Sequence, residues 1–103
     1  MAKKKPRART ERRTAARSAV KDAHAALRLA ALAPGGSADH PLVVTSASVI
    51  EPQAASAPCA VCGASTRVEE HRADPALGLR VVHVRCPTCG VARDLYFRIA
   101  QLN

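Results

Sequence analysis

The sequence predicts a small β domain of three antiparallel strands stabilised by a metal ion, preceded by a basic α-helix and a flexible linker. Two observations lead to this fold class. The first is a pair of C-x-x-C motifs, Cys59 with Cys62 and Cys86 with Cys89, which hold the only cysteines of the chain. The second is a shortage of large apolar side chains, since 103 residues include one Phe, one Tyr and no Trp. Domains with so little core material commonly need a structural metal to stay folded.

The spacing of the cysteines fits a tetrahedral zinc site. Two residues between thiolates allow one tight turn to bind an ion from two sides, and a second such turn completes a four-sulfur shell. A glycine follows each pair, at Gly63 and Gly90, and suits the positive φ with which such a turn closes. We therefore expect one structural Zn²⁺, bound by Cys59, Cys62, Cys86 and Cys89.

Two other uses of the cysteines are open. A secreted disulfide scaffold also has an even number of cysteines, but no apolar signal-peptide region follows the basic start of this chain. A rubredoxin-like iron site is surrounded by aromatic residues, in which this chain is poor. The paired spacing favours zinc over both. Together with the lack of an apolar run of about 18 residues, it predicts a cytoplasmic, reducing location and no membrane association.

The sequence around the cysteine pairs has the alternation of β-strands. Residues 66–72 alternate, residues 73–78 contain turn-forming residues, and residues 79–85 are rich in valine. Residues 91–99 alternate again after the second pair. An antiparallel hairpin between the two cysteine pairs would bring all four sulfur atoms to one end of a three-stranded sheet.

The same alternation predicts the register and the faces of the strands. Pairing Val68 with Val82 would set Glu70 opposite Arg80, an opposite-charge pair on one face. In the last strand the alternation predicts one face made of Leu95, Phe97 and Ile99, and another made of Tyr96 and Arg98.

The first third of the chain carries all of the net charge. Residues 1–33 contain ten Lys and Arg against Glu11 and Asp22, whereas residues 34–103 are formally neutral, so the net charge of +8 lies in the first third. The basic composition of residues 1–9 predicts a disordered tail, because like charges repel one another and the segment has almost no apolar side chains to bury. An organelle transit peptide, which is also Arg-rich and acid-poor, is the alternative interpretation.

A helix and a linker are expected to follow the tail. Residues 10–33 are rich in helix formers with a weak, mostly alanine stripe, Thr10 is the expected N-cap, and Pro34 stops the helix. Residues 34–57 have the Pro, Gly, Ser and Ala composition of a flexible linker. Whether the apolar residues within 42–50 form a short strand or a docking segment is open. The predicted organisation is a basic tail and helix (1–33), a flexible linker (34–57) and a metal-binding domain (58–103).

Several other residues near the cysteines have two interpretations. A zinc ion with four thiolates carries a charge of about −2, which Arg67, Arg85 and Arg93 could offset, although we favour solvated strand residues. His71 and His83 lie on neighbouring predicted strands and could form a second metal pair. We favour two half-exposed strand histidines, because a metal assignment needs ligand number and geometry.

The C-terminal part of the chain resembles a zinc ribbon, the three-stranded module found in transcription factors, RNA polymerase subunits and some ribosomal proteins. The resemblance covers residues 58–103 and rests on the four cysteines and the Cys-Pro-Thr-Cys-Gly sequence of the second pair. Among zinc ribbons it looks most like that of transcript-cleavage elongation factors. In that family an Asp-Glu dipeptide at the hairpin tip helps to hold a catalytic magnesium ion. The tip here is Asp74-Pro75, so the cleavage role does not transfer.

These observations predict a non-enzymatic protein that binds nucleic acid through its basic arm, in association with the transcription or translation machinery. Phosphate contacts of this kind position a protein without sequence preference. The alternative is an adapter that docks on RNA polymerase or the ribosome through the ribbon or the helix. No Ser-His-Asp set or phosphate-binding glycine loop is visible, and a four-thiolate zinc has no open position for water. The expected phosphate contacts are Lys3, Lys4, Lys5, Arg7, Arg9, Arg12, Arg13 and Arg17.

Overall fold

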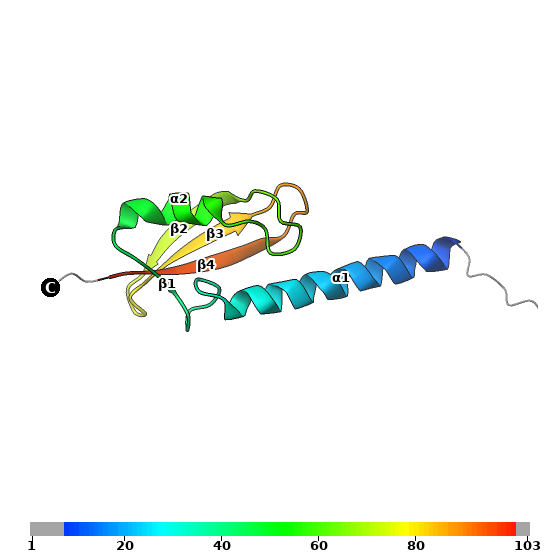
Figure 1. The fold of residues 1–103 in the computed structure, drawn as a ribbon, viewed down its shortest axis with the longest axis horizontal. Coiled ribbons are helices and arrows are strands. Elements are labelled where there is room, and N and C mark those ends of the chain that lie inside the picture. The colour runs from blue at the N-terminus through cyan, green and yellow to red at the C-terminus, as the bar shows by residue number, and fades with distance from the viewer. Residues whose placement is uncertain (1–7, 101–103) are drawn as a thin grey trace, which may run out of the picture.

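The computed structural model describes residues 8–100, which form a long N-terminal helix followed by a small domain built on a four-stranded mixed sheet (Figure 1). None of the helices in this range combines the length and the apolar character needed to cross a membrane. The elements are helix α1 (Ala8–Leu32), strand β1 (Leu42–Val44), 3-10 helix η1 (Ala47–Val49), helix α2 (Ile50–Ser56) and strands β2 (Arg67–Asp74), β3 (Leu79–Arg85) and β4 (Ala92–Ile99).

The sheet contains one strand more than the sequence predicts. Strands β2, β3 and β4 are antiparallel neighbours, as expected, but the strand order is β1-β4-β3-β2. Strand β1 pairs with β4 in parallel and places Leu42 opposite Phe97 and Val44 opposite Ile99. The backbone N–H of Ala100 extends this pairing by donating to the carbonyl of Val44 at 2.7 Å. The prediction of a purely antiparallel, three-stranded sheet is therefore wrong.

The prediction of a flexible linker is also wrong for residues 42–56. Val44, Ile50 and Ala54 of this segment are buried and belong to the same core cluster as Phe97. Helix α2 lies over one face of the sheet (Figure 1). The composition misleads here because a few apolar residues among Pro, Gly and Ser are sufficient to cover a small sheet. The rest of the core cluster comes from the sheet, at Val82, Val84 and Leu95.

The predicted faces of β4 are correct. Leu95 and Phe97 are buried in the core and Ile99 packs against it, whereas Arg98 is exposed and Tyr96 is half-buried. The aromatic ring of the only phenylalanine is thus committed to the core. It is not available as a platform on which nucleic-acid bases could stack.

The register of the β2–β3 hairpin differs from the expected one. Val68 lies opposite Val84 instead of Val82, and a bulge between Val68 and Glu70 then shifts the pairing so that Glu70 lies opposite His83. The expected pairing of Glu70 with an arginine does not form. A bulge adds one residue to one strand only, and an alternating sequence pattern does not reveal it.

Helix α1 stands largely apart from the sheet domain and extends past the end of the sheet (Figure 1). Residues 9–22 are exposed, and partly buried positions begin at Ala23. Of the predicted disordered tail, residues 1–7 lie outside the described residues, while Ala8 and Arg9 belong to α1. The expected N-cap, Thr10, lies inside the helix, so that prediction is wrong.

Two glycines shape the connection between the C-terminal end of α1 and the sheet, and Gly35 bonds to β4. Gly35 has a φ of +84°, its N–H donates to the carbonyl of His40 at 2.6 Å, and its carbonyl accepts from the N–H of Tyr96 at 2.8 Å. A Cβ atom on Gly36 would lie 2.0 Å from the carbonyl oxygen of Ala30. Only glycine therefore fits against the last turn of the helix. An open groove of about 640 Å³ lies between this end of α1 and the sheet domain.

Replacing Ile50 by alanine should destabilise the protein by about 2–5 kcal/mol, because the side chain is 0 % exposed and its loss leaves a cavity. Urea unfolding gives the free energy. Val49→Ala is the matched control. The Val49 side chain is 37 % exposed, so its truncation should lower the free energy of unfolding much less. If the two variants were equally stable, residues 42–56 would not be part of the core.

Candidate metal centre

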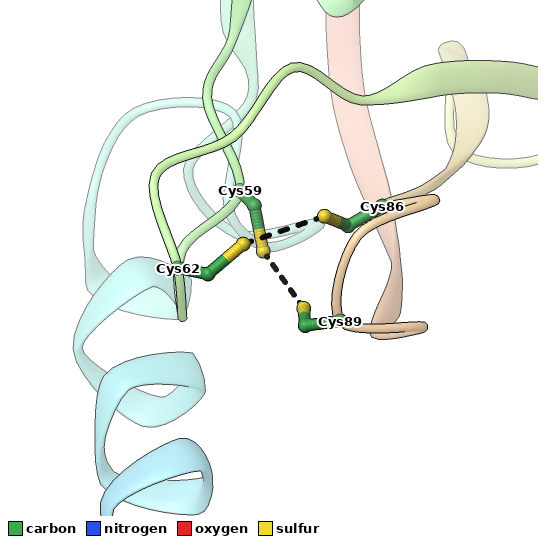
Figure 2. A group of neighbouring side chains, drawn as sticks. All are labelled: Cys59, Cys62, Cys86 and Cys89. Carbon is green, nitrogen blue, oxygen red and sulfur yellow. Dashed lines mark hydrogen bonds between the residues drawn. The ribbon is translucent and has the colours of Figure 1, made fainter.

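Two tight turns at one end of the sheet bring the four cysteines together (Figure 2). The first cysteine turn, residues 59–63, precedes β2, and the second cysteine turn, residues 86–90, joins β3 to β4. All four Sγ atoms lie within 4.8 Å of one another. Two Sγ–Sγ separations between the turns are 3.5 Å, from Cys59 to Cys89, and 3.4 Å, from Cys62 to Cys86.

The two cysteine turns share one backbone geometry. In the first turn the N–H of Cys59 donates to the carbonyl of Ala64 at 2.8 Å, and the N–H of Gly63 donates to the carbonyl of Cys59 at 2.9 Å. The corresponding bonds donated by Cys86 and Gly90 in the second turn are both 2.8 Å long. The two glycines have φ values of +77° and +79°. The expectation that glycine closes each turn with a positive φ is confirmed.

The donor set fits a single tetrahedral metal ion. Metal–sulfur bonds of about 2.3 Å place the sulfurs of a tetrahedral zinc site about 3.8 Å apart. Two separations here lie just below that value, and none exceeds 4.8 Å. The sheet domain supplies two buried ligands, Cys59 and Cys86, and two exposed ones, Cys62 and Cys89. The four sulfurs would fill all positions of the tetrahedron.

The electrostatics of the cluster favour a cation among the sulfurs. Desolvation raises the pKa of Cys59, but backbone N–H groups, that of Cys62 first, outweigh it and lower the pKa to about 6. The N–H of Cys89 likewise lowers the pKa of Cys86. The N–H of Val91 favours the Cys89 thiolate, yet desolvation and the three neighbouring thiols raise the pKa of Cys89 to about 12. Four thiolates are thus unfavourable together unless a cation offsets their mutual repulsion.

Two arginines hold the cysteine turns in place. Arg85 donates from a terminal nitrogen to the carbonyl of Gly90 at 3.2 Å and from Nε to the Glu69 carboxylate at 3.0 Å. Arg93 donates to the carbonyl of Pro58, just before the first cysteine turn, at 3.4 Å. Arg67 and Arg85 are exposed and Arg93 is half-buried, all on strands, so the interpretation as strand residues at the surface holds, and the hydrogen bonds of Arg85 and Arg93 add to it. The only sequence signal for these contacts is their position beside the cysteine pairs.

The histidines on β2 and β3 do not form a second metal pair. His83 Nδ1 lies 2.8 Å from an oxygen of Asp94, and His83 Nε2 lies 3.6 Å from an oxygen of Glu69. His71 is the register partner of Val82, and so it lies on the opposite face of the sheet from His83. Within residues 8–100 the Nε2 atom of His71 is buried without a hydrogen-bond partner. The two rings cannot reach a common ion.

The predicted phosphate-contacting residues are not part of the metal centre. Four of them lie on α1 and are exposed: Arg9, Arg12, Arg13 and Arg17. The other four lie outside the described residues: Lys3, Lys4, Lys5 and Arg7.

Removing the metal should unfold the sheet domain, because binding at small cysteine sites contributes about 10–16 kcal/mol in apparent free energy. We expect one bound metal ion per chain by elemental analysis, and loss of the strand circular dichroism signal on chelation. Cys86→Ser should have the same effect, whereas Thr88→Ser in the same turn should not. A native strand signal in metal-free protein would contradict the expectation.

Arg93→Ala should weaken metal binding about tenfold, a loss typical of groups that orient metal ligands. The substitution removes the hydrogen bond to Pro58 and a positive charge near the thiolates. Competition with a chromophoric chelator measures the affinity. Arg98→Ala makes the same charge change at the exposed far end of β4 and is the matched control. Equal affinities in the two variants would show that the Arg93 contact is unimportant.

Comparisons with known proteins give no match to this chain, whether with family models, curated proteins or solved structures. The structure itself has a zinc-ribbon-like motif, in which two C-x-x-C turns cluster beside antiparallel strands. The function is therefore to be sought in the cysteine cluster and in the charged helix that precedes it.

Proposed function

We propose that the cysteine cluster binds one Zn²⁺ ion with a structural role. Thiolates are soft ligands, and a tetrahedral set of four is characteristic of structural zinc. The ion would be held by Cys59, Cys62, Cys86 and Cys89. By binding sulfurs from both cysteine turns, it would link the two turns to each other. Such a site has no open position for water or substrate, which supports a protein that is not an enzyme. Elemental analysis distinguishes zinc from iron.

We propose further that the protein binds nucleic acid through its basic N-terminal arm. The observation that carries this proposal is the exposure of the cations on α1. Arg9, Arg12, Arg13 and Arg17 are all exposed, and the four ion pairs found within residues 8–100 all lie on the sheet. Unpaired cations bind phosphates and release the counterions condensed around them, which drives association with nucleic acid.

The distribution of charge supports the arm as the binding element. The net charge of +8 lies within residues 1–33, while six arginines balance six acids in residues 34–103. Lys3, Lys4, Lys5 and Arg7 belong to the same basic segment in sequence. Contacts to phosphate position a protein but do not select a base sequence. The activity we propose is sequence-independent binding, associated with the transcription or translation machinery.

An adapter function is the second candidate. Helix α1 exposes Val20, Leu29 and Leu32, whose side chains are 55 %, 70 % and 73 % accessible. Leu29 and Leu32 are three residues apart and so lie on the same side of the helix, where adjoining exposed apolar side chains suit a contact with another protein. An adapter would dock on a large complex such as RNA polymerase or the ribosome. Its association would persist after nuclease treatment, whereas association through phosphates would be lost.

Deleting residues 1–21 should abolish most nucleic-acid binding, because it removes nine of the cations in the basic segment. We expect the full chain to bind duplex and single-stranded nucleic acid with an affinity that falls as salt increases, by a slope of about −0.9 per phosphate contact on duplex DNA. Fluorescence anisotropy at several salt concentrations measures both quantities. Unchanged metal content shows that the truncated protein is folded. Unchanged affinity and salt slope after the deletion would refute the proposal.

A further inference from the structure

Five cations form a stripe along one side of α1. Residues four apart in a helix lie on the same side and about 6 Å apart along its axis. Arg9, Arg13, Arg17 and Lys21 follow one another at this interval, and Arg28 comes two helical turns later. We call these five residues the basic stripe. It is about 28 Å long and occupies an arc of about 120°, and all five side chains are exposed.

The other charges of α1 lie away from the basic stripe. At about 100° per residue, Arg12 lies roughly 130° from the middle of the stripe. Glu11 and Asp22, the only acids of the helix, lie equally far or farther around it on the other side. Neither acid stands three or four residues from a cation of the stripe, so neither is placed to neutralise it.

The basic stripe is unfavourable for an isolated helix. It contains three successive like-charged pairs at a spacing of four residues, and each such pair destabilises a helix. Residues 9–22 are exposed, so packing against the sheet domain does not offset this repulsion. A row of negative charges laid along the stripe would remove the repulsion and stabilise the helix at the same time.

The attachment of α1 leaves the basic stripe accessible. The helix is fastened at its C-terminal end by the Gly35–Gly36 turn, and its N-terminal half extends beyond the sheet (Figure 1). The partly buried positions lie on a side of the helix about 100° from the middle of the stripe. These positions are Ala23, Ala26, Leu27, Ala30 and Ala31.

We propose that the basic stripe docks along the phosphate backbone of a double-stranded nucleic acid. The proposal rests on the nucleic-acid binding proposed above and extends its surface along the helix to Lys21 and Arg28. A duplex presents its phosphates in regular, rigid rows, which suit evenly spaced cations on a straight helix. A single strand is bound chiefly by stacking of bases on aromatic side chains, and α1 contains no Phe, Tyr or Trp.

Charge-matched variants of the full chain test this surface. Arg17→Ala and Arg28→Ala should each lower the affinity for a 20-base-pair DNA duplex about fivefold to tenfold at 0.1 M salt, and reduce the salt slope by about 0.9. Arg98→Ala makes the same charge change on β4, outside the basic arm, and should leave the slope near that of the wild type. Duplex RNA and single-stranded DNA of equal length are the comparison probes, read by anisotropy. Tight binding to both duplexes indicates recognition of the phosphate rows alone, and a preference for one identifies the natural duplex.

The outcomes separate this inference from the proposed function. A loss in Arg17→Ala with no loss in Arg28→Ala would overturn the stripe while leaving binding by the arm intact. Tighter binding to the single strand would overturn the duplex assignment. Absence of binding by the wild-type chain at low salt would refute the proposed function itself. A rise in helical circular dichroism on addition of the duplex is the second expected sign, because phosphates relieve the repulsion within the stripe.

Discussion

The clustering of four cysteine sulfurs at one end of the sheet is the constraint around which the sheet domain is built. The sulfurs come from two turns that lie far apart in sequence yet within 4.8 Å of one another in space. Thiolates at such distances repel one another, so the arrangement needs a positive charge at its centre. Arg85 and Arg93 also link the two cysteine turns. Arg85 bonds to Gly90 of the second turn and to Glu69 of β2, which follows the first turn. Arg93 of β4, which follows the second turn, bonds to the carbonyl of Pro58, just before the first turn. One end of the sheet is therefore held by charge.

The other end is held by apolar packing of modest extent. Phe97, Ile50 and Val82 are its largest buried side chains apart from one further valine. Three of the seven buried residues of the core cluster come from β1 and α2, within a segment whose composition resembles a linker. Ala54 is fully buried in α2, and its small side chain lets the helix lie close to the sheet. The fold thus combines a cluster of cysteines at one end of the sheet with a small apolar core.

Local chemistry explains which features the sequence predicts correctly. The glycine-closed cysteine turns and the inward face of β4 depend on residues that are adjacent or alternate, and both follow from the sequence alone. The burial of Val44 and Ile50 does not follow from the sequence alone. Strand β1 has three residues and helix α2 has seven, and elements this short are stabilised only by packing against the rest of the sheet. The predicted hairpin register is wrong because of the bulge beside Val68. The hydrogen bonds of Arg85 and Arg93 are made to backbone carbonyls, and a sequence pattern does not show which carbonyls lie within reach. The metal site was therefore predictable and its surroundings were not.

The bulge in β2 also has a consequence for association between molecules. Strand β1 covers the free side of β4, which leaves β2 as the outer strand on the other side of the sheet. An outer strand with unpaired backbone groups invites a strand from another chain to pair with it. In β2 the bulge breaks the regular row of those groups, and the exposed charges of Glu69, Glu70 and Arg72 line the same strand. The irregularity that displaced the expected register thereby makes β2 a poor template for pairing with a strand of another molecule.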